Sequence, residues 1–236
     1  MTNVFAIARR EMVAYYSSFL FYVVTAGFLV ITGFFFAVGV AYSRSAQVTQ
    51  MFQNMYTILL LIAPVLTMRL LAEEQRTGTI ELLLTSPVRD TELIMGKFLG
   101  GLGLVISMLI LTGFYPLLLA MYGQPDRGGI IGGYLGAVLF GGVAIAIGLF
   151  MSSLTANQIV AAVLSFAALL ILWVIDSVGG IFGGSAGNIA SYLAVYTHFS
   201  DMTRGIVDTK DVVYFLTMIV GALFLTVRSV ETRRWR

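Results

Sequence analysis

The chain has no cysteine, a single histidine, and only 14 Lys or Arg and 12 Asp or Glu among its 236 residues. Without cysteine it can form neither disulfides nor thiolate metal sites. One histidine is a poor basis for a metal centre, so we expect no metal and no bound cofactor. No Gly-x-x-x-x-Gly-Lys-Ser/Thr phosphate loop occurs, so any nucleotide hydrolysis linked to this chain must take place in another one.

Apolar side chains are present in excess: 58% of the residues are hydrophobic and 11% are charged. A soluble domain of this size needs a charged surface around one core, and this composition excludes such a surface. We therefore expect an all-α integral membrane protein that forms a single membrane domain over residues 1–236. We expect lipid around it and no nucleic acid bound to it.

Six apolar runs are long enough to be membrane spans, at about 20 residues for each bilayer crossing. The expected spans are about 19–42, 50–71, 98–122, 132–151, 158–175 and 212–227. The last run is short and must borrow length from its flanks. No expected span carries a charge deep inside it.

Two local patterns refine the spans. Gly100, Gly101 and Gly103 give the third span a smooth face that permits close helix packing. The polar stretch 152–158 separates spans four and five and is rich in residues that favour a tight turn. Before the first span, residues 2–16 place apolar side chains opposite Arg9, Arg10 and Glu11, which predicts an amphipathic elbow helix along the headgroups.

The segment from Arg69 to Lys97 is the only long charged one, and it must face water. Gly78 and Thr79 can start a short helix there, and Pro87 can stop it. The apolar residues of those two turns share one face, so the helix can lie on a bilayer or fill a groove in a partner. The simpler alternative is an interfacial helix whose charges are merely solvated.

The stretch EEQRTGTIELLLTSPV within this segment resembles the cytoplasmic loop of type-2 ABC transporter permeases. In that family, two acidic residues precede a Gly-Thr pair and a Leu-rich coupling helix that docks on the ATPase subunit. The resemblance assigns ATPase coupling to Glu73, Glu74, Arg76, Gly78, Thr79, Glu81 and Pro87. It implies a non-catalytic permease subunit, with ATP bound and hydrolysed by a partner chain.

Orientation follows from the basic residues. With six spans and both termini in the cytoplasm, ten of the 14 lysines and arginines lie inside. The remaining four, Arg44, Arg127, Arg204 and Lys210, lie outside, in accord with the positive-inside rule. We expect a multi-pass protein of the cytoplasmic (inner) membrane, with the segment 69–97 in the cytoplasm.

The C-terminal stretches HFSDMTRGIVDTKDVVYFL and VETRRWR resemble permeases linked to gliding motility and to copper-site maturation of a nitrous-oxide-reducing enzyme. Apolar residues at helical spacing in 189–207 predict extracytoplasmic re-entrant helices before the last span, with one face in the outer leaflet. The candidate gate residues there are His198, Phe199, Arg204 and Asp208. We expect Arg204 to pair with Asp208, and His198 to bond to backbone or to Asp201.

A membrane-embedded protease and an ion-coupled secondary transporter are the alternative functions. A membrane-embedded protease can use paired glutamates such as Glu73 and Glu74, but it needs histidines beside them, and the one histidine is expected on the other side of the bilayer. An ion-coupled secondary transporter needs ionisable residues in mid-span. The sequence favours an ATP-driven permease that performs export or mechanical work, paired with a second permease copy or a related permease. It leaves the substrate open between lipids, hydrophobic compounds and no small molecule.

Overall fold

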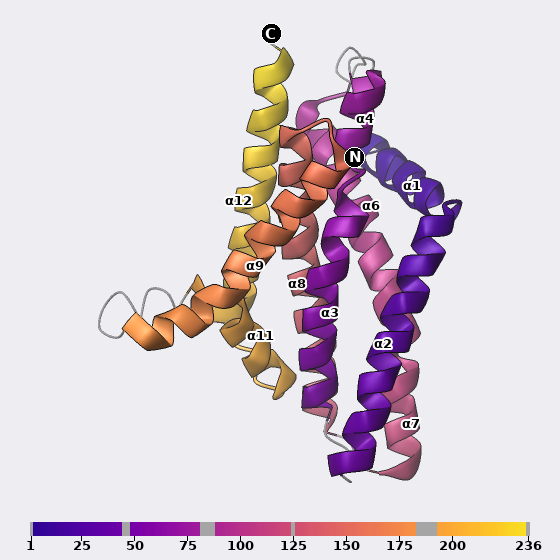
Figure 1. The fold of residues 1–236 in the computed structure, drawn as a ribbon, viewed down its shortest axis with the longest axis vertical. Coiled ribbons are helices and arrows are strands. Elements are labelled where there is room, and N and C mark those ends of the chain that lie inside the picture. The colour runs from indigo at the N-terminus through magenta and orange to yellow at the C-terminus, as the bar shows by residue number, and fades with distance from the viewer. Residues whose placement is uncertain (1, 44–47, 81–87, 124–125, 183–192, 235–236) are drawn as a thin grey trace.

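The computed structural model describes residues 2–43, 48–80, 88–123, 126–182 and 193–234 (Figure 1). All regular secondary structure in these ranges is helical, which confirms the expected all-α class. The helices are α1 (Thr2–Tyr16), α2 (Phe19–Ser43), α3 (Thr49–Thr67), α4 (Ala72–Thr77), α6 (Asp90–Thr112), α7 (Phe114–Tyr122), α8 (Arg127–Leu154), α9 (Gln158–Phe182), α11 (Val195–Thr203) and α12 (Thr209–Arg234).

Six helical segments are long and apolar enough to cross a membrane, and they correspond to the six expected spans. They are Phe19–Ala41, Thr49–Thr77, Asp90–Met121, Arg127–Leu154, Gln158–Ile175 and Thr209–Thr232. The chain is therefore a multi-pass membrane protein.

Several helices are longer than the apolar runs that predicted them. Helix α6 begins at Asp90 rather than near 98, and α9 continues to Phe182, beyond the expected end at 175. Helix α12 extends the run 212–227 at both ends, which supplies the length that this run lacks. The physical reason is that hydropathy marks only the part of a helix that matches the bilayer, whereas polar and charged residues can continue the same helix into the interface.

Helices α3 and α8 form the centre of the bundle and are its most buried spans, whereas α2, α9 and α12 expose much of their apolar surface. Helix α8 packs against α3, α6, α9, α11 and α12. Glycines permit this close approach: a Cβ at Gly148 would lie 2.1 Å from Thr67 Oγ1, and one at Gly133 would lie 2.3 Å from the Phe52 ring. Small residues of this kind let membrane helices approach closely.

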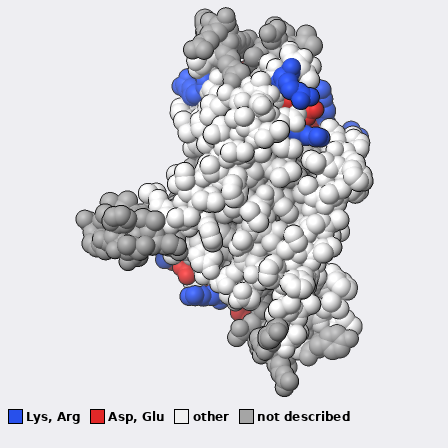
Figure 2. Space-filling model, in the orientation of Figure 1, with Lys and Arg blue, Asp and Glu red and all other residues white. Residues whose placement is uncertain are grey.

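Charged side chains gather toward two ends of the molecule, with a broad uncharged band between them (Figure 2). Helix α4, the elbow helix α1 and the last described turn of α12 lie toward one end, called here the α4 end (Figure 1). Helix α11 and the first turn of α12 lie toward the other, called the α11 end. The chain begins and finishes toward the same end, as an even number of crossings requires. That the α4 end faces the cytoplasm stays a prediction.

Candidate coupling site

Helix α4 is anchored by the last turn of α8. The backbone amides of Leu71 and Ala72, at the start of α4, donate to Ser152 Oγ at 3.1 and 2.9 Å. Gln75 Nε2 donates to the carbonyl of Ser153 at 2.9 Å. A helix N-terminus has amides without partners inside the helix, and Ser152 on another span satisfies two of them. Helix α4 is therefore hydrogen-bonded directly to the end of α8.

Gly78 ends α4, where the sequence had suggested that it starts the next helix. Its φ of 73° lies in the left-handed region, which glycine adopts without steric cost and which commonly closes a helix. Helical backbone resumes at Thr79 and Ile80, and Ile80 is buried. The remainder of the predicted coupling helix, with Glu81 and Pro87, lies outside the described residues.

Lys97 joins three helices at the α4 end. Its Nζ donates to Glu11 Oε1 of α1 and to Glu74 Oε1 of α4, each at 2.7 Å. The Lys97 side chain is 2% exposed, and the two carboxylates are 16% and 20% exposed. We call Glu11, Lys97 and Glu74 the charge triad. Because this site is largely desolvated, removing Lys97 would leave two carboxylates close together without a cation, and breaking a buried ion pair in this way typically costs about 3–5 kcal/mol.

Glycines on one face of α6 form a groove, and α1 packs into this groove. A Cβ at Gly96 would lie 2.7 Å from Ile7 Cβ, and one at Gly100 would lie 2.7 Å from Glu11 Cβ. Gly103 continues this face one turn later, against Met12. Of the three glycines expected to form one smooth face of the third span, Gly100 and Gly103 line this groove, whereas Gly101 faces Ile145 of α8. The groove places Glu11 next to Lys97.

Tyr15 adds a further tie between α1 and α3. Its hydroxyl donates to the Leu66 carbonyl. Burial raises the pKa of the Tyr15 phenol, so the hydroxyl keeps the proton that it donates. The elbow predicted for residues 2–16 is therefore a packed helix, joined to α3 by Tyr15 and to α4 and α6 by Glu11.

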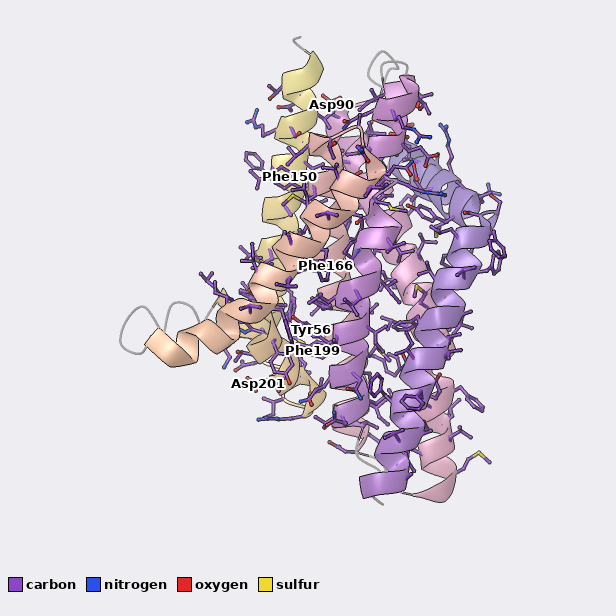
Figure 3. The ribbon with its side chains drawn as sticks, in the orientation of Figure 1. Tyr56, Asp90, Phe150, Phe166, Phe199 and Asp201 are labelled. Carbon is purple, nitrogen blue, oxygen red and sulfur yellow. The ribbon has the colours of Figure 1, made fainter. Side chains whose placement is uncertain are left out.

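The α11 end is built differently, around aromatic rings. Tyr56 of α3 lies 4.9 Å from Phe199 of α11 and 4.1 Å from Phe140 of α8, measured between ring centroids. Figure 3 shows Tyr56 and Phe199 close together between α3 and α11. Phe199 and Met202 are completely buried. The apolar face of α11 thus packs on the bundle rather than entering the outer leaflet as expected, because glycines on α8 leave room for it.

His198 pairs with a residue that sequence reasoning did not select. Its Nδ1 lies 2.6 Å from Asp211 Oδ1 in the first turn of α12, and its ring stacks on Tyr214 at 4.1 Å. The expected partner was backbone or Asp201. Asp211 is completely buried, and a buried carboxylate requires a polar or charged partner, which His198 supplies.

Arg204 and Asp208 do not share a helix. Helix α11 ends at Thr203, and Gly205 turns the chain with a φ of 82°. Asp208 instead contacts Lys210 at 3.2 Å, where both side chains are well exposed. The expected pairing of Arg204 with Asp208 is therefore wrong, because the turn at Gly205 breaks the helical spacing on which it was based.

Comparison with known proteins shows the family to which this chain belongs. The model of the ABC-2 family transporter proteins matches residues 40–228, which is most of the chain. This chain belongs to the ABC-2 family. A probable multidrug ABC transporter permease, YbhS, of Escherichia coli K12 is 27% identical over 191 residues, covering 75% of this chain and 49% of the relative. The same permease from Escherichia coli O157:H7 matches equally. The chain spans about half the length of these relatives.

The ABC-2 domain brings together only some of the residues selected from sequence. Helix α4 and its C-cap contain four of them, Glu73, Glu74, Arg76 and Gly78. Of these four, Glu74 belongs to the charge triad. Arg76 and Thr79 are exposed. Glu11, Lys97 and Ser152 were missed as site residues. The signal available for Lys97 was its position next to Gly96 and Gly100, on the face that α1 covers.

Proposed function

We propose that this ABC-2 chain is the permease subunit of an ATP-driven transporter, in which a separate ATPase docks on the segment 72–87. The family membership and the resemblance of EEQRTGTIELLLTSPV to permease coupling loops support this proposal. ATP is bound by the partner, and this chain performs no catalysis. The α4 end then faces the cytoplasm, in the inner membrane, as the distribution of basic residues favours.

The observation that carries the proposal is that α4 is held on two sides. Lys97 ties it to α1 and α6, and Ser152 ties it to α8. A segment that receives force must be connected rigidly to the elements that it moves, and buried ion pairs and hydrogen bonds provide such connections. Displacement of α4 by an ATPase is thereby passed to the elbow and to two spans.

In this proposal the ABC-2 chain works as one of a pair, as the resemblance to type-2 ABC transporter permeases implies. A second copy or a related permease, together with two ATPase subunits, completes the transporter in this proposal. The Escherichia coli relatives are named as probable multidrug permeases, which favours multidrug transport as the role of this chain. The gliding-motility and copper-maturation assignments depend on the C-terminal residues alone and stay predictions, as does the gate role of His198, Phe199, Arg204 and Asp208.

Ion coupling is less compatible with the same structure. Among the described residues, the two completely buried Lys or Asp side chains are Lys97 and Asp211, and each is paired near a helix end. A secondary transporter places such groups near mid-span beside broken helices.

Co-purification tests the docking proposal. An affinity-tagged chain is purified from its native membrane, and the ATPase that accompanies it is identified and quantified. Glu81→Arg reverses a charge on the proposed docking surface, so the yield of ATPase should fall several-fold while the yield of permease is unchanged. Arg228→Gln, on exposed α12 surface at the same end, is the control. Unchanged ATPase recovery with Glu81→Arg and with Gly78→Trp would refute docking at this segment.

A further inference from the structure

A cavity of about 310 Å³ lies beside the charge triad, between α1, the α3–α4 connection and α6. Its wall contains equal numbers of basic and acidic side chains. They are Arg10, Arg69, Lys97, Glu11, Glu73 and Glu74. Since a water molecule occupies about 30 Å³ in the liquid, the cavity has room for a polar group of several non-hydrogen atoms.

The wall has unsatisfied hydrogen-bonding groups of both kinds. Lys97 uses Glu74 Oε1, but the second oxygen, Oε2, is buried and accepts no hydrogen bond from the described residues. Arg69 Nε is likewise buried and donates none, since its 3.9 Å contact with Glu73 Oε2 is too long. Buried polar groups are normally satisfied, so this cavity favours a ligand with one donor group and one acceptor group.

The side chains that line the cavity limit the chemical class of ligand that it can bind. A guanidinium matches phosphate oxygens, and a carboxylate matches the N–H groups of a primary ammonium. A quaternary ammonium has no N–H to give to Glu74 Oε2 and is usually held by an aromatic cage. Of the described residues that line the cavity, Tyr15 is the one aromatic, and its hydroxyl is already bonded to Leu66. Ethanolamine phosphate fits this wall, and choline phosphate does not.

The source of such a group is the membrane. The cavity wall includes Ala14, Tyr15 and Ser18, at the junction of α1 and α2. Just beyond this junction, Phe19 and Tyr22 of α2 are 82% and 58% exposed. Charged side chains at this end border the uncharged band in Figure 2. A headgroup in the cavity leaves its acyl chains free to run along α2. We infer that this cavity binds the headgroup of phosphatidylethanolamine, with phosphate on Arg69 and Arg10 and ammonium on Glu73 and Glu74. The inference does not depend on the coupling role of α4.

Native mass spectrometry of the full chain tests the inference without any ATPase. The chain is purified into nanodiscs with equal amounts of phosphatidylethanolamine, phosphatidylcholine and phosphatidylglycerol, and the retained lipids are counted. Retained phosphatidylethanolamine should exceed phosphatidylcholine by about tenfold, the effect of one charge-assisted hydrogen bond. Arg69→Gln should lower retention of all three lipids. Glu73→Gln should remove the preference for phosphatidylethanolamine over phosphatidylglycerol. Arg228→Gln, an exposed arginine outside the cavity, should change nothing.

Other outcomes overturn the inference. Equal retention of the ethanolamine and choline lipids would refute recognition of the primary amine. A preference that survives both Arg69→Gln and Glu73→Gln would place the lipid elsewhere. Soluble phosphoethanolamine added to nanodiscs without the ethanolamine lipid separates the two sources: if it binds the wild-type chain while the lipid is not enriched, the site serves a soluble compound and the lipid inference fails.

Discussion

The α4 end and the α11 end of this ABC-2 domain are both tightly packed, but they are held by different forces. At the α4 end, one buried lysine contacts carboxylates of α1 and α4, and a serine of α8 accepts hydrogen bonds from the backbone at the start of α4. At the α11 end, Tyr56, Phe140 and Phe199 fill the space between α3, α8 and α11. The buried polar pair there is His198 with Asp211.

The two ends should differ in how strongly substitutions lower their stability. Apolar packing tolerates substitutions that conserve volume, since contacts are numerous and individually weak. A buried charge tolerates almost none, because its stability depends on specific partners. We therefore expect the α4 end to act as a rigid joint and the α11 end to tolerate repacking.

The largest effect should come from Lys97→Met, which leaves Glu11 and Glu74 buried and close to each other. The free energy of unfolding should fall by about 3–5 kcal/mol. Thermal unfolding of the purified chain in detergent measures the loss. The triple variant Glu11→Gln, Lys97→Met, Glu74→Gln removes all three charges and should recover most of it. If the free energy of unfolding of the single variant fell by less than about 1 kcal/mol, the triad would contribute no more than an exposed ion pair and would not hold α1, α4 and α6 together.

Ser152→Ala should follow, with a loss of about 1–3 kcal/mol, because the Leu71 and Ala72 amides lose their acceptor in a buried place. Ser107→Ala is the matched control: its hydroxyl donates only to Leu104 of its own helix, so its change should stay within about 0.5 kcal/mol. Equal losses in the two variants would remove Ser152 from the joint. Thermal unfolding measures both.

Phe199→Leu tests the α11 end. It removes an aromatic contact but keeps an apolar side chain, so the loss should not exceed about 1.5 kcal/mol. Phe199→Asn is the counterpart, because it buries an amide among rings and should cost more than twice as much. Similar losses for the two variants, measured by the same unfolding experiment, would contradict the account of this end as apolar packing.

The smallest effect belongs to Arg228→Gln, which breaks the exposed pair of Arg228 with Glu231 on α12. An exposed ion pair contributes less than about 1 kcal/mol. Its unfolding temperature should match that of the wild type within error, and a loss as large as that of Lys97→Met would show that charge at this end matters regardless of burial.

The six spans and the helix over 2–16 could be predicted from sequence because uninterrupted apolar runs and an amphipathic segment leave few alternatives. Lys97 could not be assigned, because a lysine at the edge of a span normally extends its ammonium into the interface. Its burial depends on Glu11 and Glu74, which lie far from it in sequence. Ser152 also has partners that are distant in sequence, namely the amides at the start of α4. The sequence alone therefore indicates only a turn residue at this position.

The pairing of His198 with Asp211 shows another limit. Sequence spacing favoured Asp201, which lies nearby on the same helix, and it also favoured a pair between Arg204 and Asp208. The pairing of Arg204 with Asp208 assumed one continuous helix, whereas α11 ends at Thr203. Spacing rules hold only within one helix, and the turn at Gly205 brings the start of α12 to His198.

By contacting Glu11 and Glu74 together, Lys97 should make α1 and α4 move as one body. Because the chain has no cysteine, spin labels can be placed at Arg9→Cys on α1 and Arg76→Cys on α4, both exposed. Double electron–electron resonance on the purified chain should give one narrow distance distribution, unchanged by Arg228→Gln and clearly broadened by Lys97→Met. A distribution of the same width with and without Lys97 would contradict the claim.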